Sequence, residues 1–60
     1  IEYVIQINGK KRSLINAMKD IEEKALLELV ENDTLLNKYL KDNKIKKIIF
    51  VKNRLMNILV

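Results

Sequence analysis

Apolar and polar residues alternate at the start of the chain, which predicts a strand over residues 1–7 with one apolar face. That face is formed by Ile1, Tyr3, Ile5 and Ile7. Asn8-Gly9 follows directly, and this pair is typical of a tight hairpin turn because both residues tolerate positive φ. Residues 11–17 are expected to form the antiparallel return strand, with Leu14 as its inward-facing residue. The opening segment is therefore predicted to be a β-hairpin.

The hydrophobic spacing then changes to a helical period. Asp20 stands three residues before Glu23, a capping-box spacing that predicts a helix beginning at Asp20. The apolar face of this helix is expected to carry Ile21, Ala25, Leu26, Leu29 and Val30. Asn32-Asp33-Thr34 interrupts the pattern, and a second helix is expected over about residues 35–42. Its buried residues are expected to be Leu35, Leu36, Tyr39 and Leu40, and Asp42-Asn43 would end it.

A second hairpin is predicted in the last third of the chain. Residues 45–51 are β-branched and aromatic and predict a strand, in which Phe50 is expected to point inward. Lys52-Asn53 can form a two-residue turn, because asparagine tolerates positive φ. Residues 55–60 then return as the last strand, one face of which carries Met56, Ile58 and Val60. The chain is thus predicted to be one small α+β domain of order ββααββ, with two β-hairpins flanking a helical crossover and both helices on one face of the sheet.

Composition excludes several classes of protein. The 60 residues contain neither cysteine nor histidine, so a disulfide framework and thiolate or imidazole metal sites are excluded. No apolar run approaches the roughly 20 residues of a membrane span, and no signal-peptide pattern opens the chain. No Ser/His/Asp or Cys/His set, phosphate loop or glycine-rich nucleotide fingerprint is present. The chain by itself is therefore not expected to be an enzyme, and its start inside a strand pattern suggests a domain of a longer protein.

Charge is sorted by region along the chain, which a uniform compositional bias would not produce. Residues 8–19 carry four cations and no acid, and residues 44–54 carry five cations and no acid. Residues 20–33 carry six acids against Lys24 alone. With a net charge of +4, the two hairpin turns are expected to form one positive end that attracts phosphate. The alternative is that the turns are simply solvated and the acidic helix neutralises them.

The two ends of the chain resemble motifs of one enzyme family. The opening run Ile5-Gln6-Ile7-Asn8-Gly9-Lys10-Lys11-Arg12 is similar to the V-Q-V-N-G-K-x-R signature of the C-terminal domain of bacterial-type leucyl-tRNA synthetases. The closing run from Lys46 to Val60 is similar to that domain's K-x-V-I-x-V-P-G-[KR]-L-V-N-I-V-V ending. Lys38-Tyr39-Leu40, after the acidic helix, is similar to a K-Y-L segment of the family. Two departures stand out: Lys52-Asn53 occupies the place of Pro-Gly, and residues 16–19 are less regular than the family pattern.

The resemblance implies a non-catalytic tRNA-binding domain of a leucine–tRNA ligase. It implies contact with the outer corner of tRNA(Leu), where the D and T loops meet, in support of aminoacylation and editing. The ATP, leucine, zinc and editing sites of the family lie in parts of the enzyme outside this chain, so no cofactor is expected here. The expected partners are tRNA(Leu) and the rest of the synthetase, the expected location is the cytoplasm, and the isolated chain is expected to be monomeric.

Seven cations are the candidate tRNA contacts. Lys10 and Arg12 match the opening signature, and Lys47 and Arg54 match basic positions of the closing motif. Lys11 lies at a variable position of the signature, and charge alone supports Lys46 and Lys52. The scarcity of aromatic residues near these cations favours contact with the backbone of folded RNA over a base-stacking platform. Asn8 and Gly9 are expected to set the turn.

Two other functions remain open from the sequence. The chain could be a protein-interaction domain that docks through its acidic helix, in which case reversing Glu28 and Glu31 would abolish binding. It could also be a purely structural domain of its parent enzyme. For Asn57, which matches a family asparagine, a hydrogen bond to backbone and a contact with RNA are both compatible with the sequence.

Overall fold

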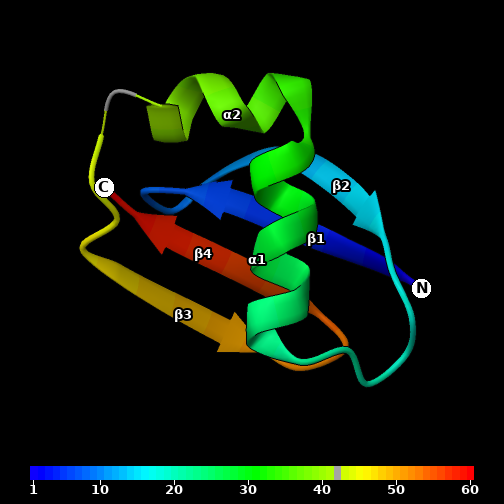
Figure 1. The fold of residues 1–60 in the computed structure, drawn as a ribbon. Helices are drawn as coiled ribbons and strands as arrows, with labels where there is room; N and C mark the ends of the chain where they lie inside the picture. Colours follow the sequence, from blue (N-terminus) through cyan, green and yellow to red (C-terminus); the bar gives the residue numbers. More distant parts are fainter. Residues whose placement is uncertain (42) are drawn as a thin grey trace.

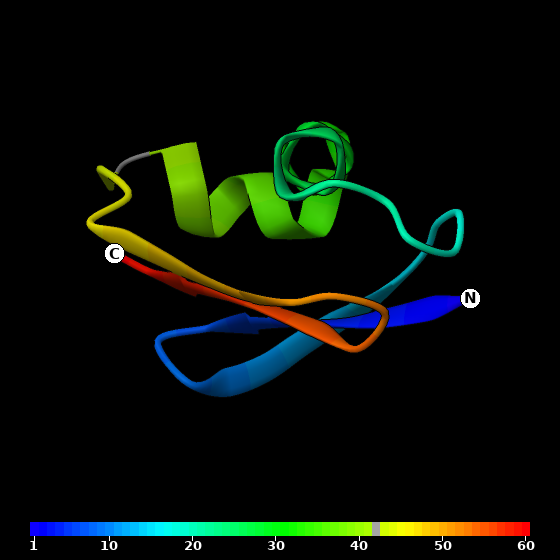
Figure 2. The same cartoon turned by 90° about the horizontal axis from the view of Figure 1, so that it is seen from below.

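The computed structural model describes residues 1–41 and 43–60 and has the predicted α+β order ββααββ (Figure 1). Its elements are β1 (Glu2–Ile7), β2 (Lys10–Asn16), α1 (Glu23–Asn32), α2 (Thr34–Lys41), β3 (Lys47–Val51) and β4 (Leu55–Leu59). The predicted end of the second helix at Asp42 lies outside the described residues. Both helices lie on one face of a single sheet, as predicted, and the view along the sheet shows the two layers (Figure 2).

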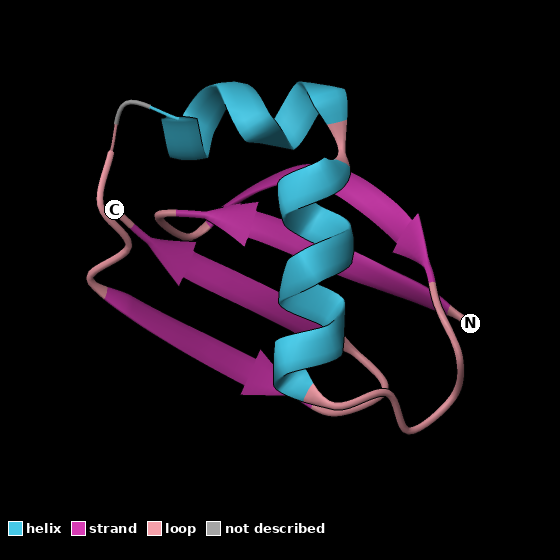
Figure 3. Ribbon diagram, in the orientation of Figure 1, coloured by secondary structure: helices cyan, strands magenta, loops and turns pink. Residues whose placement is uncertain are grey.

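The strand order of the sheet is β2-β1-β4-β3 (Figure 3). Each hairpin is antiparallel, and the two hairpins join through a parallel pairing of β1 with β4 that runs from Val4↔Leu55 to Ile7↔Ile58. Because β1 and β4 run in the same direction, the turn that follows β1 lies at the opposite end of the sheet from the turn that precedes β4. This arrangement decides where the charged turns lie.

The core lies between the helices and the two central strands. Eight hydrophobic side chains are buried there, seven of them fully: Tyr3, Ile5, Ile7, Leu26, Val30, Leu36, Met56 and Ile58. The alternation predicted for the first and last strands is confirmed, except that Ile1 precedes β1 and is 49% exposed. Phe50 packs partly buried against this core and stacks on Tyr3, with ring centroids 6.3 Å apart. Burying each such side chain contributes about 1.5–3 kcal/mol, so the central strands are the stable part of the sheet.

The inward face of the second strand differs from the prediction. Leu14 is 44% exposed and pairs with Val4 on the sheet face away from the helices, whereas Ile15 packs against the core. The cause is a register irregularity: Ile5 pairs with Ser13, but the next residue of β1 pairs with Lys11. This leaves Arg12 as an extra residue in β2. An extra residue shifts the alternation of side chains by one position. The prediction treated β2 as a regular strand and therefore placed Leu14 on the wrong face.

The first helix begins at Glu23, not at the predicted Asp20, and Glu22 at its N-cap makes no side-chain cap hydrogen bond. Asp20 instead adopts a left-handed conformation, with φ of 62°. Its backbone N–H donates to Asn53 Oδ1 (2.6 Å), and its carboxylate Oδ1 accepts from Asn53 Nδ2 (2.8 Å). Asp20 therefore anchors the loop before α1 to the β3–β4 turn, a contact across 33 positions that a local capping pattern cannot reveal.

The helices bury fewer residues than their patterns predicted. On α1, Leu26 and Val30 are buried, but Ala25 and Leu29 are exposed. On α2 only Leu36 is buried, whereas Leu35 is 61% and Tyr39 37% exposed. Two short helices over a four-stranded sheet each present one narrow stripe to the core, so the flanking apolar residues stay at the surface.

The break between the helices forms as predicted around Asp33. Its side-chain Oδ1 accepts from the backbone N–H groups of Leu35 (2.9 Å) and Leu36 (3.1 Å). This is the pattern of an N-cap, in which a carboxylate satisfies free N–H groups at the start of a helix. Asp33 therefore fixes where α2 begins.

The sheet face away from the helices is partly apolar. The alternation of the strands places on it Val4, Leu14, Ile49, Val51, Leu55 and Leu59. Leu14, Ile49 and Val51 are each at least 40% exposed, and the other three are partly buried. No helix of the described chain covers this face (Figure 2).

Candidate nucleic-acid interface

The β1–β2 turn has a defined backbone. Asn8 (φ 52°) and Gly9 (φ 84°) both adopt the positive φ that the sequence predicted for a primed turn. The Gly9 N–H donates to Asn57 Oδ1 (2.9 Å), and Asn8 Oδ1 accepts from the Val60 N–H (2.9 Å). The Asn57 side chain thus hydrogen-bonds to the backbone, which is one of the two roles that were compatible with the sequence. These bonds fasten the turn to the end of β4.

Three cations follow this turn on β2. Lys10 pairs with Ile7 and Lys11 with Gln6, and both lysines are exposed. Arg12 occupies the irregular position described above, and its guanidinium carbon Cζ lies 5.1 Å from the centre of the Tyr39 ring on α2. Arg12 is therefore directed toward the helical layer, whereas Lys11 shares the face of Gln6, away from the helices.

The start of β3 brings two more predicted cations to the same end of the sheet. Lys47 pairs with Leu59 at the end of β4, and the Lys46 N–H donates to the Leu59 carbonyl (2.7 Å). Both lysines are exposed. Because the hairpins join through β1 and β4, Lys10 and Lys47 lie in the two edge strands, about 14 Å apart at a strand spacing near 4.8 Å.

Helix α2 adds cations that the sequence analysis did not select. Lys38 and Lys41 lie in its last turn, and this end of α2 lies at the same end of the molecule as the β1–β2 turn (Figure 1). Cations there are stabilised by the negative end of the helix dipole. The sequence could have indicated these two lysines, because they are spaced at i and i+3 in the last turn of a predicted helix. The neighbouring acidic segment drew attention away from them.

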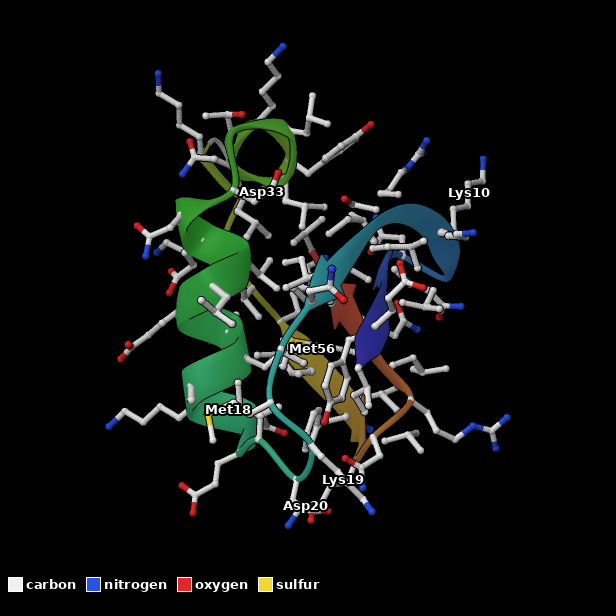
Figure 4. All side chains as sticks on the ribbon, turned by 90° about the vertical axis from the view of Figure 1, so that its right-hand side faces the viewer. Lys10, Met18, Lys19, Asp20, Asp33 and Met56 are labelled. Atoms are coloured by element: carbon white, nitrogen blue, oxygen red, sulfur yellow. The ribbon has the colours of Figure 1, made fainter. Side chains whose placement is uncertain are left out.

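We call this end of the molecule the basic end. Its residues are Lys10, Lys11, Arg12, Lys38, Lys41, Lys44, Lys46 and Lys47. They come from residues 8–12 and 38–47, where the sequence has Asp42 as the one acidic residue. Figure 4 shows Lys10 extending from the hairpin into solvent.

Lys52 and Arg54 lie at the opposite end of the sheet, beside the β3–β4 turn. The turn has the predicted positive φ, at Asn53 (64°), and Asn53 Oδ1 also accepts from the Tyr3 hydroxyl (3.1 Å). The prediction that both hairpin turns contribute to one positive end is therefore wrong, because the parallel pairing of β1 with β4 separates them. Lys19 and Asp20 lie together at this second end (Figure 4).

The separation between the two groups of cations exceeds the distance over which salt screens charge. The terminal Cα atoms of β4, a strand of five residues, are about 13 Å apart at roughly 3.3 Å per residue. At physiological ionic strength the screening length is about 8 Å. A phosphate held at the basic end is therefore only weakly influenced by Lys52 and Arg54.

The described surface offers no enclosed site. No pocket is present among residues 1–41 and 43–60, and within the same residues no group of three acidic, histidine or cysteine side chains could hold a metal ion. None of the described helices is long and apolar enough to cross a membrane.

No family model matches the chain. Individual curated proteins do match the chain. The chain is 40% identical over 57 residues to the leucine–tRNA ligase of Buchnera aphidicola, and this match covers 95% of this chain and 7% of that protein. It is 44% identical over 59 residues to the enzyme of Prochlorococcus marinus, covering 98% of this chain and 7% of that protein. The enzyme of Caldanaerobacter subterraneus is 42% identical over 60 residues, a match that covers 100% of this chain and 7% of that protein.

A solved structure shares the fold. It is the crystal structure of Agrobacterium radiobacter LeuRS in a ternary complex with tRNA and LeuAMS, which matches with a TM-score of 0.90 and 27% identity over 98% of this chain and 8% of that chain. Fold and sequence therefore define the chain as a domain of the aminoacyl-tRNA synthetase class. Within that class its whole length matches leucine–tRNA ligases, consistent with their C-terminal domain, and it spans about 7% of the length of these relatives. The resemblance predicted from the two end motifs is confirmed.

Proposed function

We propose that this chain is a non-catalytic tRNA-binding module that contacts the outer corner of tRNA(Leu), where the D and T loops meet, through its basic end. The observation that carries the proposal is the convergence of eight cations from two segments on one end of a small, pocketless surface. Lysine and arginine side chains bind phosphate oxygens, and this contact positions a protein on a folded nucleic acid without reading its bases. The tRNA in the structurally similar LeuRS complex supports the choice of ligand.

The proposed contacts are the eight residues of the basic end: the predicted Lys10, Lys11, Arg12, Lys46 and Lys47, joined by Lys44 and by the two lysines of α2. Lys52 and Arg54 stay candidates for a second contact, because an RNA long enough to follow the sheet could reach both ends. The proposal also assigns the protein that carries this domain the activity of a leucine–tRNA ligase in the cytoplasm. ATP, and zinc where it is present, would bind in the parts of that enzyme outside this chain. Those parts and tRNA(Leu) would be the partners of this domain.

The experiment is a binding titration of the 60-residue chain against folded tRNA(Leu) across a salt series. An unstructured RNA of equal length serves as competitor. The proposal expects preference for the folded RNA and an affinity that falls steeply with salt, with a log–log slope of about 0.7–0.9 for each phosphate contact. Protection of the D and T loops from nuclease would place the contact at the corner. Equal affinity for the two RNAs would contradict it.

A protein-interaction function remains the second candidate, and the partly apolar open face of the sheet favours it. Large contiguous apolar patches on a protein surface often mark protein contact sites. The acidic helix, the other docking surface, presents Glu28 and Glu31 to solvent. Binding to the rest of the synthetase that is lost on Glu28→Lys with Glu31→Lys would support docking through the helix. A lowered melting temperature of the parent enzyme on deletion of this domain, with tRNA affinity intact, would indicate a purely structural role.

A further inference from the structure

Arg12 and Tyr39 form a contact that neither the core nor the hairpin requires. The guanidinium Cζ lies 5.1 Å from the centre of the Tyr39 ring, within the range of a cation–π interaction. Tyr39 is 37% exposed and is not among the buried core residues. The pair connects β2 to α2, two elements that come from separate parts of the chain.

The local backbone explains why Arg12 reaches the helix. It is the extra residue of β2, so it leaves the regular alternation in which Lys11 shares the open face of the sheet with Gln6. A shift of this kind is a common means of redirecting one side chain of a strand. The long, flexible arginine stem would otherwise sample many rotamers, and fixing it costs up to about 2 kcal/mol of rotamer entropy.

A cation–π contact holds a guanidinium beside a ring without using all of its five N–H donors. These donors lie in the plane of the guanidinium, where they match the spacing of two phosphate oxygens. Among the side-chain hydrogen bonds of residues 1–41 and 43–60, none uses the Arg12 guanidinium. Arg12 thus combines a side chain held beside a ring with N–H donors that none of these hydrogen bonds uses.

We propose that Tyr39 is a positioning residue that holds Arg12 for a two-pronged contact with one phosphate of the RNA backbone. The inference rests on the proposed RNA-binding function and deepens it, because it distinguishes Arg12 from the lysines of the basic end. Those lysines act as mobile point charges, whereas Arg12 is oriented before the RNA arrives. Preorganisation of this kind raises affinity by reducing the entropy lost on binding.

The test measures Kd for folded tRNA and its salt dependence for four variants of the chain: Tyr39→Leu, Tyr39→Phe, Arg12→Ala and the double variant Arg12→Ala with Tyr39→Leu. Tyr39→Leu is expected to weaken binding about two- to fivefold, the size of a cation–π contact at an exposed site. Its salt slope should not change, because the number of phosphate contacts is the same. Tyr39→Phe should bind within about twofold of the unchanged chain, because the ring remains.

The double variant separates positioning from a structural role. In the Arg12→Ala background, Tyr39→Leu should have no further effect on Kd, because the residue it positions is gone. Leu35→Ala is the matched control, since Leu35 lies on the same helix and is 61% exposed. Circular dichroism confirms that each variant is folded at the assay temperature.

The outcomes also distinguish this inference from the proposed function. If Arg12→Ala weakens binding but Tyr39→Leu does not, or if the two losses simply add, the positioning role is overturned and the RNA interface stands. If Arg12→Ala is without effect while loss of Lys10 and Lys47 weakens binding, Arg12 is not a contact and the inference again fails alone. If none of these cations affects binding, the proposed function itself fails.

Discussion

Removing two lysines from the basic end should weaken tRNA binding far more than removing two cations from the opposite end. The variants are Lys10→Ala with Lys47→Ala, and Lys52→Ala with Arg54→Ala. Each pair lowers the net charge by the same amount, from +4 to +2. The first pair acts on the two edge strands at the basic end, and the second acts on the β3–β4 turn.

The expected size of the effect follows from counterion release. Each phosphate contact adds about 0.7–0.9 to the log–log salt slope, so losing two contacts lowers the slope by about 1.4–1.8. Extrapolated between 0.15 M and 1 M salt, this corresponds to a binding loss of roughly 15- to 30-fold at 0.15 M. The second pair lies more than a screening length of about 8 Å from the basic end, and we expect it to cost less than about threefold.

The assay is fluorescence anisotropy of labelled folded tRNA, with thermal unfolding of each variant as the control for stability. All four residues are exposed, so the free energy of unfolding should change by no more than about 0.5 kcal/mol. Equal losses for the two pairs would show that net charge alone drives binding. A larger loss for Lys52 and Arg54 would move the interface to the opposite end and refute the reasoning.

Three further predictions concern stability and are checked by chemical unfolding. Asn53→Ala removes the hydrogen bonds to Asp20 and Tyr3 and puts alanine at positive φ, so it should cost about 2–4 kcal/mol; a loss below 1 kcal/mol would show that this network contributes little. Asp33→Ala removes the cap of α2 and should cost about 1 kcal/mol, with Asp33→Asn restoring most of it; equal losses for both would argue against capping. Leu26→Ala should cost about 2–5 kcal/mol, whereas Leu35→Ala should cost under about 0.5 kcal/mol; comparable losses would contradict the assigned core.

The features that the sequence predicted correctly depend on residues close together in the chain. The Asn8-Gly9 turn, the alternation of β1 and β4 and the break at Asp33 all form where local patterns place them. Asn53 adopts positive φ in place of the family's glycine, which explains how Lys52-Asn53 still makes a turn. In each case the physical cause acts over a few residues.

The predictions that failed concern features set by contacts and pairing between elements. Asp20 matched a capping pattern, but its backbone and side chain bind Asn53, and the helix begins three residues later. Leu14 points outward because of one extra residue at Arg12, a backbone irregularity without a glycine to mark it.

The cations selected from the sequence lie at two ends of the sheet, not at the single end that was predicted. The cations of the β1–β2 turn and of the start of β3 do lie at one end, but Lys52 and Arg54 do not. Strand order decides this, and either an antiparallel or a parallel pairing between the hairpins was compatible with the sequence. Lys38 and Lys41 lie at the basic end because of how α2 is placed over the sheet, which the sequence alone did not show.

The most direct test of the basic end as the tRNA interface is an amide chemical-shift titration of the 15N-labelled chain with folded tRNA(Leu). The account predicts that the largest shifts and line broadening fall on residues 8–12, 38–41 and 43–47, and that residues 52–54 change little. Perturbations centred on residues 52–54 or on α1, with the basic end unaffected, would contradict it.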